Sequence, residues 1–568
     1  MSALNKESSH CDLCRLLCHV LKDKATTPND LLRFFRVGST IRVNNQQLPA
    51  ILSLYALAGK ERLYNANIQL GHPKLPDAGD ARHVSVLTGW LRNCDRDHEC
   101  MPLGNQSFLP TRLLDVNFSA TSCRLISDTN QLGQNSKYLA LSHRWGTHPD
   151  PSLATKIVCT YETNIQRLAE GVEDSDFPPL YQDAISVARK LGVRYLWIDS
   201  LCIIQAEPGN PNDRDQGRDF LREAGKMELV FSSAYATIAT TCAGSPAEHF
   251  LKRRPKRQFA TIPTERGPYY LAEVIDKFSE DVDRSELNSR GWVFQERALS
   301  RRTIYFAEKQ TYWECGEGVR CETLTRTENT KSSVLGDANF PFALPDFDKG
   351  KRIKLYQTLY ERYTRLTFTY PTDRPIAIRG LETRLLRALQ TSGGYGVFQL
   401  YLCRGLLWQR EGPSLTRIDF SKSPARNAYE FVPSWSWMAY DGPIRYMEIP
   451  AAAEWAAWKS DVISPWECGG ADDGAEPFEL RVLVRNVVGF APGGRVLLDE
   501  PNRTSKLDLR CVVVGSKRAS DPMQAEVYYS LIVTILDGEE HICQRAGVAF
   551  LERRHIDWQS QAVAMRVR

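Results

Sequence analysis

The chain has 568 residues, of which 42% are hydrophobic and 25% are charged, and its formal net charge is +4. This composition is typical of a globular protein of about three domains and excludes a disordered chain. So small a net charge gives no argument for a nucleic-acid partner, and no apolar run approaches the ~18 residues that cross a membrane.

Two further features indicate the compartment. The N-terminus has no basic start followed by an apolar core, so it does not resemble a signal peptide. The fifteen cysteines are odd in number and lie mostly inside apolar segments, which is typical of a reduced protein and not of a disulfide framework. The sequence therefore predicts a cytoplasmic protein with no membrane partner and no nucleic-acid partner.

The pattern divides the chain into three regions. The first carries clustered cysteine and histidine, the second alternates strands with helices, and the third is helical and then rich in strands. The expected boundaries are 1–120, 121–325 and 326–568. We find no internal repeat and no low-complexity tract.

The first region contains two groups of residues that could bind a metal ion. They are Cys11-x2-Cys14, and Cys94-x3-His98-x-Cys100. Tetrahedral Zn²⁺ takes four thiolate or imidazole ligands, so one interpretation is a structural zinc site made by the CxxC pair and the second group. The other is that Cys14 and Cys18, four residues apart, share the buried face of an N-terminal helix.

The second region predicts an α/β domain. A strand, a helix and a second strand within about 60 residues favour a parallel pair of strands. The expected strands are 138–142, 194–199, 235–240 and 302–306. The expected helices are 179–191, which begins at Pro179 and stops before Gly192, and 219–234.

Polar residues follow two of these strands. The stretch Ser142-His143-Arg144-Trp145-Gly146 ends the first strand, and Asp199 ends the second. In an open α/β sheet, ligands bind beyond the carboxyl ends of the strands, so these residues are candidates for a binding site. The alternatives are a strand-end turn with a packed tryptophan, and an Asp199 that only caps a helix.

The densest segment of chemistry-bearing residues is 288–315. Glu296 lies there among apolar neighbours, which indicates a partly buried carboxylate, and four arginines surround it in sequence. One interpretation is an acid or electrostatic catalyst at a cleft. The other is a structural carboxylate paired with one of the arginines.

The third region opens with helical patterns and ends in short strands. Trp435 and Trp437, in the stretch PSWSWM, are expected to pack as aromatic anchors between the C-terminal region and its neighbours. The expected helices are 351–367 and 378–390, and the expected strands include 480–490, 507–515 and 527–536. The stretch 545–554 is expected to belong to the same β-rich end.

Four blocks in the second region occur in an order that identifies a family. They are 138–146 (YLALSHRWG), 183–205 (DAISVARKLGVRYLWIDSLCIIQ), 219–240 (DFLREAGKMELVFSSAYATIAT) and 288–315 (NSRGWVFQERALSRRTIYFAEKQTYWEC). This set resembles the HET domain, the heterokaryon incompatibility domain of filamentous fungi. Two positions depart from the family pattern, since His143 stands where tyrosine is more frequent and Ile204 where asparagine is usual.

The resemblance implies a role in fungal nonself recognition, in which activation triggers growth arrest or programmed cell death. HET domains are similar to TIR domains, so the implied fold is a flavodoxin-like, three-layer domain with a parallel sheet. Some TIR domains cleave NAD⁺ with one glutamate, and the stretch from Ser289 to Glu296 falls in the corresponding order. The resemblance therefore implies that Glu296 is catalytic.

The same resemblance implies a nucleotide cleft and partners. The residues expected to line the cleft are Ser142, Arg144, Trp145, Gly146, Asp199 and Trp292. The expected partners are NAD⁺ or a related nucleotide, other incompatibility proteins, and further copies of the chain on activation. The alternative is a non-enzymatic death or adaptor module that oligomerises and recruits partners.

Overall fold

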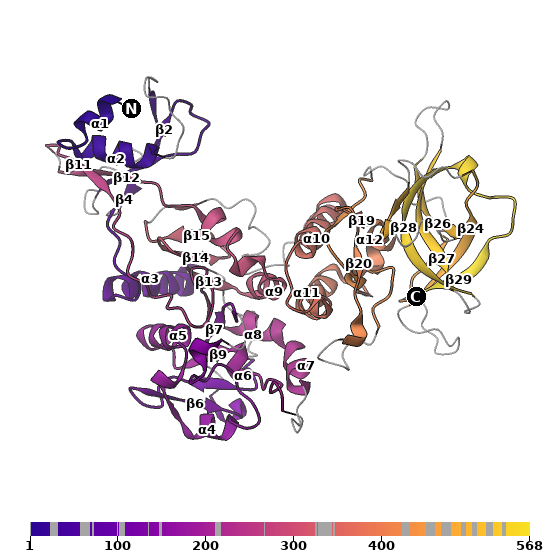
Figure 1. Cartoon of the computed structure of the whole chain (residues 1–568), viewed down its shortest axis with the longest axis horizontal. Helices are drawn as coiled ribbons and strands as arrows, with labels where there is room; N and C mark the ends of the chain where they lie inside the picture. Colours follow the sequence, from indigo (N-terminus) through magenta and orange to yellow (C-terminus); the bar gives the residue numbers. More distant parts are fainter. Residues whose placement is uncertain are drawn as a thin grey trace. The chain divides into compact units, whose positions relative to one another are not determined.

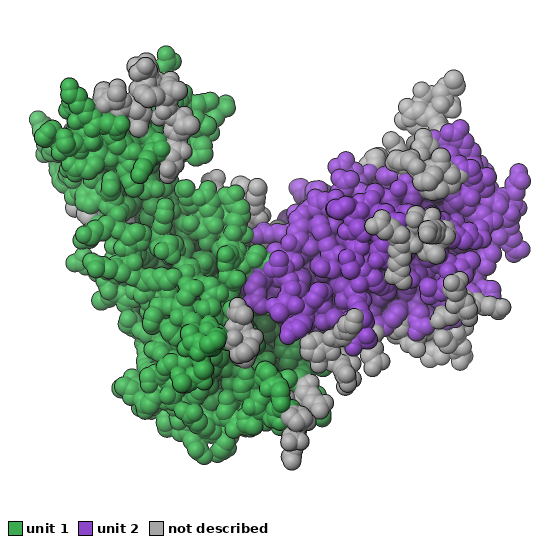
Figure 2. Space-filling model, viewed as in Figure 1, with its two compact units in different colours: residues 1–289, 296–340 green, residues 290–295, 341–568 purple. Residues whose placement is uncertain are grey.

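The structure is a computed structural model. It describes residues 2–22, 32–56, 69–70, 73–98, 100, 108–133, 136–146, 150–210, 217–265, 267–323, 326–327, 344, 347–422, 431–449, 461–466, 479–489, 496–501, 508–517, 526–536 and 541–568. The chain forms two compact units (Figure 2). The first is Met1–Ser289 with Glu296–Phe340, and the second is Arg290–Gln295 with Pro341–Arg568. The division therefore falls within one helix, α9 (Gly291–Leu299).

A ten-stranded sheet lies in the middle of the first unit (Figure 1). Its order is β16-β15-β14-β13-β10-β7-β9-β5-β6-β8, and β13, β10, β7 and β9 are parallel. Every residue of these four strands is buried, as expected where both faces of a parallel sheet are covered. The bounds are β5 Leu113–Asp115, β6 Ser122–Ile126, β7 Tyr138–Ser142, β8 Val172–Glu173, β9 Tyr195–Ile198, β10 Ala236–Ala239, β13 Arg302–Phe306, β14 Thr311–Cys315, β15 Gly318–Cys321 and β16 Arg326–Thr327.

These strands confirm the four predicted from the sequence. β7 and β13 begin and end at the predicted residues, and β9 and β10 are one residue shorter at each end. Helix α5 (Pro179–Lys190) joins β7 to β9, with proline in its first turn and Gly192 (φ +71°) just beyond its end. The prediction of one continuous helix over 219–234 is wrong, because the structure has two helices there, α7 (Arg218–Ala224) and α8 (Met227–Ser233). Gly225 lies between them, and glycine destabilises a helix interior.

A smaller sheet and two helices pack together at the N-terminal end of the first unit. The sheet runs β1-β2-β3-β12-β11 with β4 beside β3, so it combines strands from the N-terminal region with two that lie between β10 and β13 in the chain. Leu16, Leu17 and Leu21 of α2 are buried against this sheet. The bounds are α1 Ser2–Glu7, α2 Asp12–Leu21, β1 Phe34–Val37, β2 Thr40–Val43, β3 Leu52–Ala56, β4 Gln69–Leu70, β11 Phe259–Ile262 and β12 Tyr269–Glu273. The remaining helices of the unit are α3 Ala81–Asp97, α4 Ile165–Glu170 and α6 Asp199–Cys202.

The second unit is helical first and then β-rich, as predicted. Its last strands form a small closed barrel, because β29 pairs with both β24 and β28 and so joins the ends of the row β24-β26-β27-β28. The bounds of the larger elements are α10 Lys349–Thr364, α11 Arg379–Leu389, α12 Leu402–Leu406, β23 Val462–Ile463, β24 Leu480–Asn486, β25 Val496–Leu498, β26 Leu509–Lys517, β27 Val527–Ile535, β28 Ile542–Glu552 and β29 Val563–Val567. Three short pairs are β17 Gly393–Gly394 with β18 Val397–Phe398, β19 Trp408–Arg410 with β22 Ile444–Tyr446, and β20 Thr416–Arg417 with β21 Tyr440–Asp441.

Trp435 and Trp437 are fully buried inside this second unit. Trp437 packs against Tyr360 and Tyr363 of α10, with ring centroids 5.1 and 5.9 Å apart. Trp435 belongs to the apolar core that the barrel strands share with α12. Both therefore act as aromatic anchors within the second unit, and their expected place between the C-terminal region and its neighbours stays a prediction. In the described parts of the chain, no helix is both long and apolar enough to cross a membrane.

Candidate functional site

A polar cluster lies at the carboxyl ends of β7 and β9, which are parallel neighbours. Asp199 is its centre, because Oδ2 accepts the indole N–H of Trp145 at 2.8 Å and Oδ1 accepts the backbone N–H of Ser200 at 2.7 Å. The imidazole Nδ1 of His143 lies 3.8 Å from Oδ1. The structure thus brings together the loop after β7 and the residue after β9, which the sequence singled out separately.

A buried tyrosine connects the two loops behind this cluster. The hydroxyl of Tyr181, on α5, lies 3.2 Å from His143 Nε2 and 2.7 Å from Ser200 Oγ. The rings of His143 and Tyr181 meet edge to face with centroids 5.3 Å apart. Burial raises the pKa of Tyr181 well above its ordinary value, so the phenol stays neutral and fixes both loops without adding charge.

Two unpaired hydroxyls lie where β7 and β10 end. Ser142 Oγ and Thr240 Oγ1 are buried and have no hydrogen-bond partner among the described residues. Their backbones are adjacent, since the N–H of Thr240 donates to the carbonyl of Ser142 at 3.1 Å. Buried polar groups normally have partners, so these hydroxyls mark a place where a ligand or an ordered water would complete the bonding.

The loop after β7 lies against the segment after β10. Gly146 has φ +69°, and a Cβ placed there would come within 2.7 Å of the Ser245 Cβ, so only glycine fits. Arg144 pairs with Glu286, whose side chain is 78% exposed. A surface ion pair contributes only about 0–1 kcal/mol, so the Arg144 guanidinium can exchange this partner for an anionic ligand.

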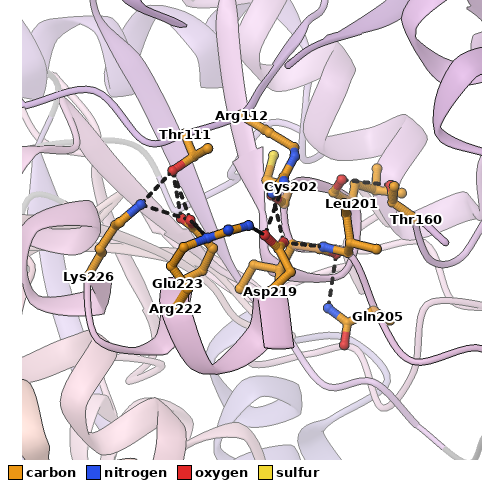
Figure 3. Close-up of polar contacts among 12 residues, drawn as sticks. Thr111, Arg112, Thr160, Leu201, Cys202, Gln205, Asp219, Arg222, Glu223 and Lys226 are labelled. Atoms are coloured by element: carbon orange, nitrogen blue, oxygen red, sulfur yellow. Dashed lines mark hydrogen bonds and ion pairs between the residues drawn. The ribbon is translucent and has the colours of Figure 1, made fainter. Parts of the chain in front are cut away.

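A buried ion pair holds the segment that follows β9 (Figure 3). Arg112 donates to both carboxylate oxygens of Asp219, at 2.8 and 3.0 Å, and to the Cys202 carbonyl at 3.1 Å. Asp219 also accepts the backbone N–H of Ile204 at 2.8 Å. Burial acts to raise the pKa of Asp219, but the bonds from Arg112 and Ile204 outweigh it and the pKa is lowered. Because residue 204 is held through its backbone, this bond does not require the asparagine usual in the family.

A second part of the same network lies beside it (Figure 3). Thr111 donates to Glu223, and the Lys226 ammonium donates to Thr111 at 2.8 Å and to Glu223 at 2.9 Å. Thr160 anchors the same segment by donating to the Leu201 carbonyl at 2.7 Å. The sequence analysis missed this support. Asp219 opens the third block, but nothing local points to a partner more than a hundred residues earlier.

Glu296 is buried on α9, with 7% of its surface exposed. Arginines that surround it in sequence pair with other carboxylates: Arg297 with Glu314 at 3.0 Å, and Arg302 with Asp95 at 2.6 Å. The carbonyl of Glu296 accepts from Ser300, whose Oγ lies 2.7 Å from Thr237 of β10. This contact places the last turn of α9 beside the amino-terminal half of β10, and Glu296 lies one turn nearer the start of the helix.

Trp292 belongs to the second unit. Its indole N–H donates to Asp373 at 3.1 Å, and burial raises the pKa of Asp373 to about 6. Two residues later, Phe294 packs against Tyr363 with centroids 5.7 Å apart. Both side chains therefore act in packing within that unit.

The Cys/His residues gather differently from the prediction. One ligand atom from each of Cys94, His98, Cys100 and Cys315 lies within 4.8 Å of all the others. Cys11 and Cys14 are not part of this group and instead begin α2, where Cys11 Sγ accepts the N–H of Cys14 at 3.4 Å. Cys315, at the end of β14, is the member that the sequence analysis missed. Contacts with Cys100 and Cys94 lower the pKa of Cys315, and contacts with Cys100 and Cys315 raise that of Cys94.

A comparison with known protein families gives one match. Residues 138–296 match the family described as heterokaryon incompatibility protein (HET). The match begins at the first residue of β7 and ends at Glu296, so it contains the polar cluster and the two unpaired hydroxyls. No curated protein and no solved structure matches the chain.

Proposed function

Residues 138–296 form a HET domain with a role related to heterokaryon incompatibility, and from this premise we propose that the domain triggers growth arrest or cell death by cleaving NAD⁺. The observation that carries the proposal is the pair of unpaired hydroxyls, Ser142 and Thr240, beside the Asp199 cluster. These groups form a polar site at the sheet edge where α/β domains bind nucleotides.

The strand order supports a TIR-like domain. Numbered along the chain, β7, β9, β10 and β13 are strands 1 to 4, and their spatial order is 2-1-3-4. This is the start of the flavodoxin-like order, whose ligand site lies between strands 1 and 3. Here those strands are β7 and β10, which end at Ser142 and Ala239. The position of the unpaired hydroxyls at the ends of these two strands supports a ligand site there.

The residues of this edge have the chemistry that a dinucleotide requires. The hydroxyls of Ser142 and Thr240 can bond to ribose hydroxyls or to a carboxamide. Arg144 can exchange its exposed partner for a pyrophosphate, which suits the forked guanidinium. Asp199 is held in place by Trp145 and Ser200, so its position does not depend on the ligand.

The proposed reaction needs one carboxylate. Water adds to the anomeric carbon of the nicotinamide ribose as the bond to the ring nitrogen breaks, which yields ADP-ribose, nicotinamide and a proton. The transition state resembles an oxocarbenium ion, so an ionised Glu296 would stabilise its positive charge or accept the proton of the water. The buried position of Glu296 would strengthen such an interaction.

The test uses a double variant that leaves the fold intact. An unpaired buried hydroxyl costs about 1–3 kcal/mol of desolvation, so Ser142→Ala with Thr240→Val should have an unchanged or higher Tm. If the hydroxyls bind the nucleotide, the purified full-length variant should lose NAD⁺ hydrolysis by about tenfold or more. The readouts are nicotinamide release and calorimetry.

The matched control is Thr163→Val with Ser175→Ala, which also removes one threonine and one serine hydroxyl, but at two exposed positions. Its hydrolysis should equal that of the wild type. Wild-type hydrolysis by the Ser142/Thr240 variant would refute the binding role. Growth arrest by the wild-type chain without any fall in NAD⁺ would refute the enzyme and favour the non-enzymatic adaptor.

A further inference from the structure

Four potential metal ligands meet in the first unit, outside the matched HET segment. Cys94 lies in the last turn of α3, His98 caps the C-terminus of that helix, Cys100 follows, and Cys315 ends β14. The three cysteines are buried, with 0%, 2% and 3% of their surfaces exposed. One ligand atom from each residue lies within 4.8 Å of the others.

The distance between one sulfur and the imidazole nitrogen matches that between two ligands of one zinc ion, and all four ligand atoms lie within 4.8 Å of one another. Zn–S bonds of about 2.3 Å and Zn–N bonds of about 2.0–2.1 Å in a tetrahedron put sulfur and nitrogen about 3.5 Å apart and two sulfurs about 3.8 Å apart. Cys315 Sγ and His98 Nδ1 are 3.5 Å apart. A disulfide would instead need two of the sulfurs at about 2.05 Å, and all three cysteines are free.

We propose that Cys94, His98 through Nδ1, Cys100 and Cys315 bind one Zn²⁺ as a closed structural site. The four side chains fill a tetrahedron, so no position remains for a substrate or a catalytic water. Binding displaces one proton from each of three thiols, and the product is a Zn(Cys)₃(His) centre with a net charge of −1.

The surroundings offset that negative charge. Arg302 is buried beside the cluster, where it pairs with Asp95 at 2.6 Å and interacts electrostatically with Cys94. Arg301 donates to the carbonyl of Cys100 at 3.0 Å. The turn after Cys315 adds backbone donors, since the N–H groups of Gly316 and Glu317 act on the sulfurs of Cys100 and Cys315. Such outer contacts orient the ligands of metal sites.

The site would connect two segments that lie far apart in the sequence. Cys100 and Cys315 are separated by 215 positions, and the ion would join the end of α3 to the hairpin of β14 and β15. That hairpin extends the sheet from β13, which directly follows α9. A cross-link over so long a loop restricts the unfolded chain, so we infer that zinc stabilises the whole first unit and has no catalytic role.

The first test measures bound metal. The full-length protein, purified without chelators, should carry about one equivalent of zinc by elemental analysis. Cys315→Ser and Cys94→Ser should each carry less than about a tenth of an equivalent. Cys11→Ser and Cys14→Ser are the matched controls, because they remove the other candidate ligands, and they should keep the full equivalent.

The second test needs no variant and so does not depend on whether a variant folds. Treating the wild-type protein with a strong chelator should release the zinc and lower the Tm of the first unit, and adding zinc back should restore it. The proposal is overturned by a protein that neither carries nor takes up zinc, by loss of zinc from the Cys11→Ser or Cys14→Ser variant, or by a disulfide between cluster cysteines.

Discussion

Glu296 and Arg297 are adjacent on α9 but differ in what holds them. Arg297 is fully buried with Glu314 and Asp283, at 3.0 and 2.6 Å, and its guanidinium lies 5.5 Å from the Tyr305 ring centroid. That arrangement is complete without a ligand and is structural. Under the proposed function Glu296 supplies the catalytic carboxylate, so it is the residue whose substitution separates the enzyme from the adaptor.

Glu296→Gln keeps the size of the side chain and removes its charge. If the carboxylate stabilises the transition state, the loss costs on the order of 3 kcal/mol, which is a hundredfold or more in rate. The variant should fold with the wild-type Tm, cease NAD⁺ hydrolysis and no longer arrest growth. These effects are measured by nicotinamide release, by calorimetry and by colony growth.

Glu280→Gln is the control for that experiment. Glu280 has an exposed side chain and pairs with Lys277 and Arg284 on the surface, so its substitution should change neither rate nor growth. A Glu296→Gln protein that is well folded and still arrests growth would remove the catalytic role and leave the adaptor as the better explanation. A large fall in Tm would instead identify Glu296 as structural.

Individual elements were easier to predict than the contacts between them. The strands at β7 and β13 follow from short runs of β-branched, aromatic and other apolar residues, and a strand buried on both faces needs no alternation. Helix spacing alone did not reveal the interruption at Gly225. The Arg112–Asp219 pair, the approach of Cys315 to α3 and the pairing of β12 with β3 depend on tertiary structure, which local patterns do not encode. The approach of Ser142 to Asp199 could be predicted from the sequence, because neighbouring parallel strands end at the same edge of a sheet.

Helix α11 carries a pH-dependent carboxylate. Glu382 is buried, and its Oε1 accepts the backbone N–H of Gly396 at 2.6 Å. Burial raises the pKa of Glu382 from 4.5 to about 7, against the opposing effects of Gly396 and Arg379. The folded unit therefore binds more protons than the unfolded chain. The stabilisation that protonated Glu382 gives the folded unit is complete below pH ~4.5 and is lost as the pH rises through ~7.

We expect the free energy of unfolding of the second unit to fall by about 3 kcal/mol between pH 4.5 and 8, because one pKa unit corresponds to about 1.4 kcal/mol. Glu382→Gln, which cannot ionise, should flatten the dependence and raise the Tm at pH 8. Denaturant unfolding at several pH values measures both. An equal slope in the wild-type protein and the variant would assign the pH dependence to other groups.

The division between the two units falls within α9, the helix that carries Glu296. Residues 290–295 belong by their contacts to the second unit. There Trp292 bonds to Asp373, and Gln295 accepts the N–H groups of Gly380 and Leu381 at 2.7 and 3.3 Å. Gly291 lies so close to Phe368 that a Cβ would come within 1.9 Å of its ring. We propose that the second unit regulates the HET domain through this shared helix.

The proposal predicts how a shortened chain behaves. A fragment of residues 1–340 keeps Glu296 but lacks the partners of Trp292, Phe294 and Gln295, so the first half of α9 should fray and expose two aromatic side chains. We expect the fragment to bind a hydrophobic dye, to exchange the amide hydrogens of α9 faster than the full chain, and to lose NAD⁺ hydrolysis while β7, β9 and β10 stay protected. In the full chain, Gln295→Ala removes the acceptor for two N–H groups of α11. This substitution should lower the free energy of unfolding of the second unit by about 1–2 kcal/mol, and the amide hydrogens of α9 should exchange faster, as in the fragment. A fragment as protected in α9 and as active as the full chain would show that the HET domain is independent of the second unit.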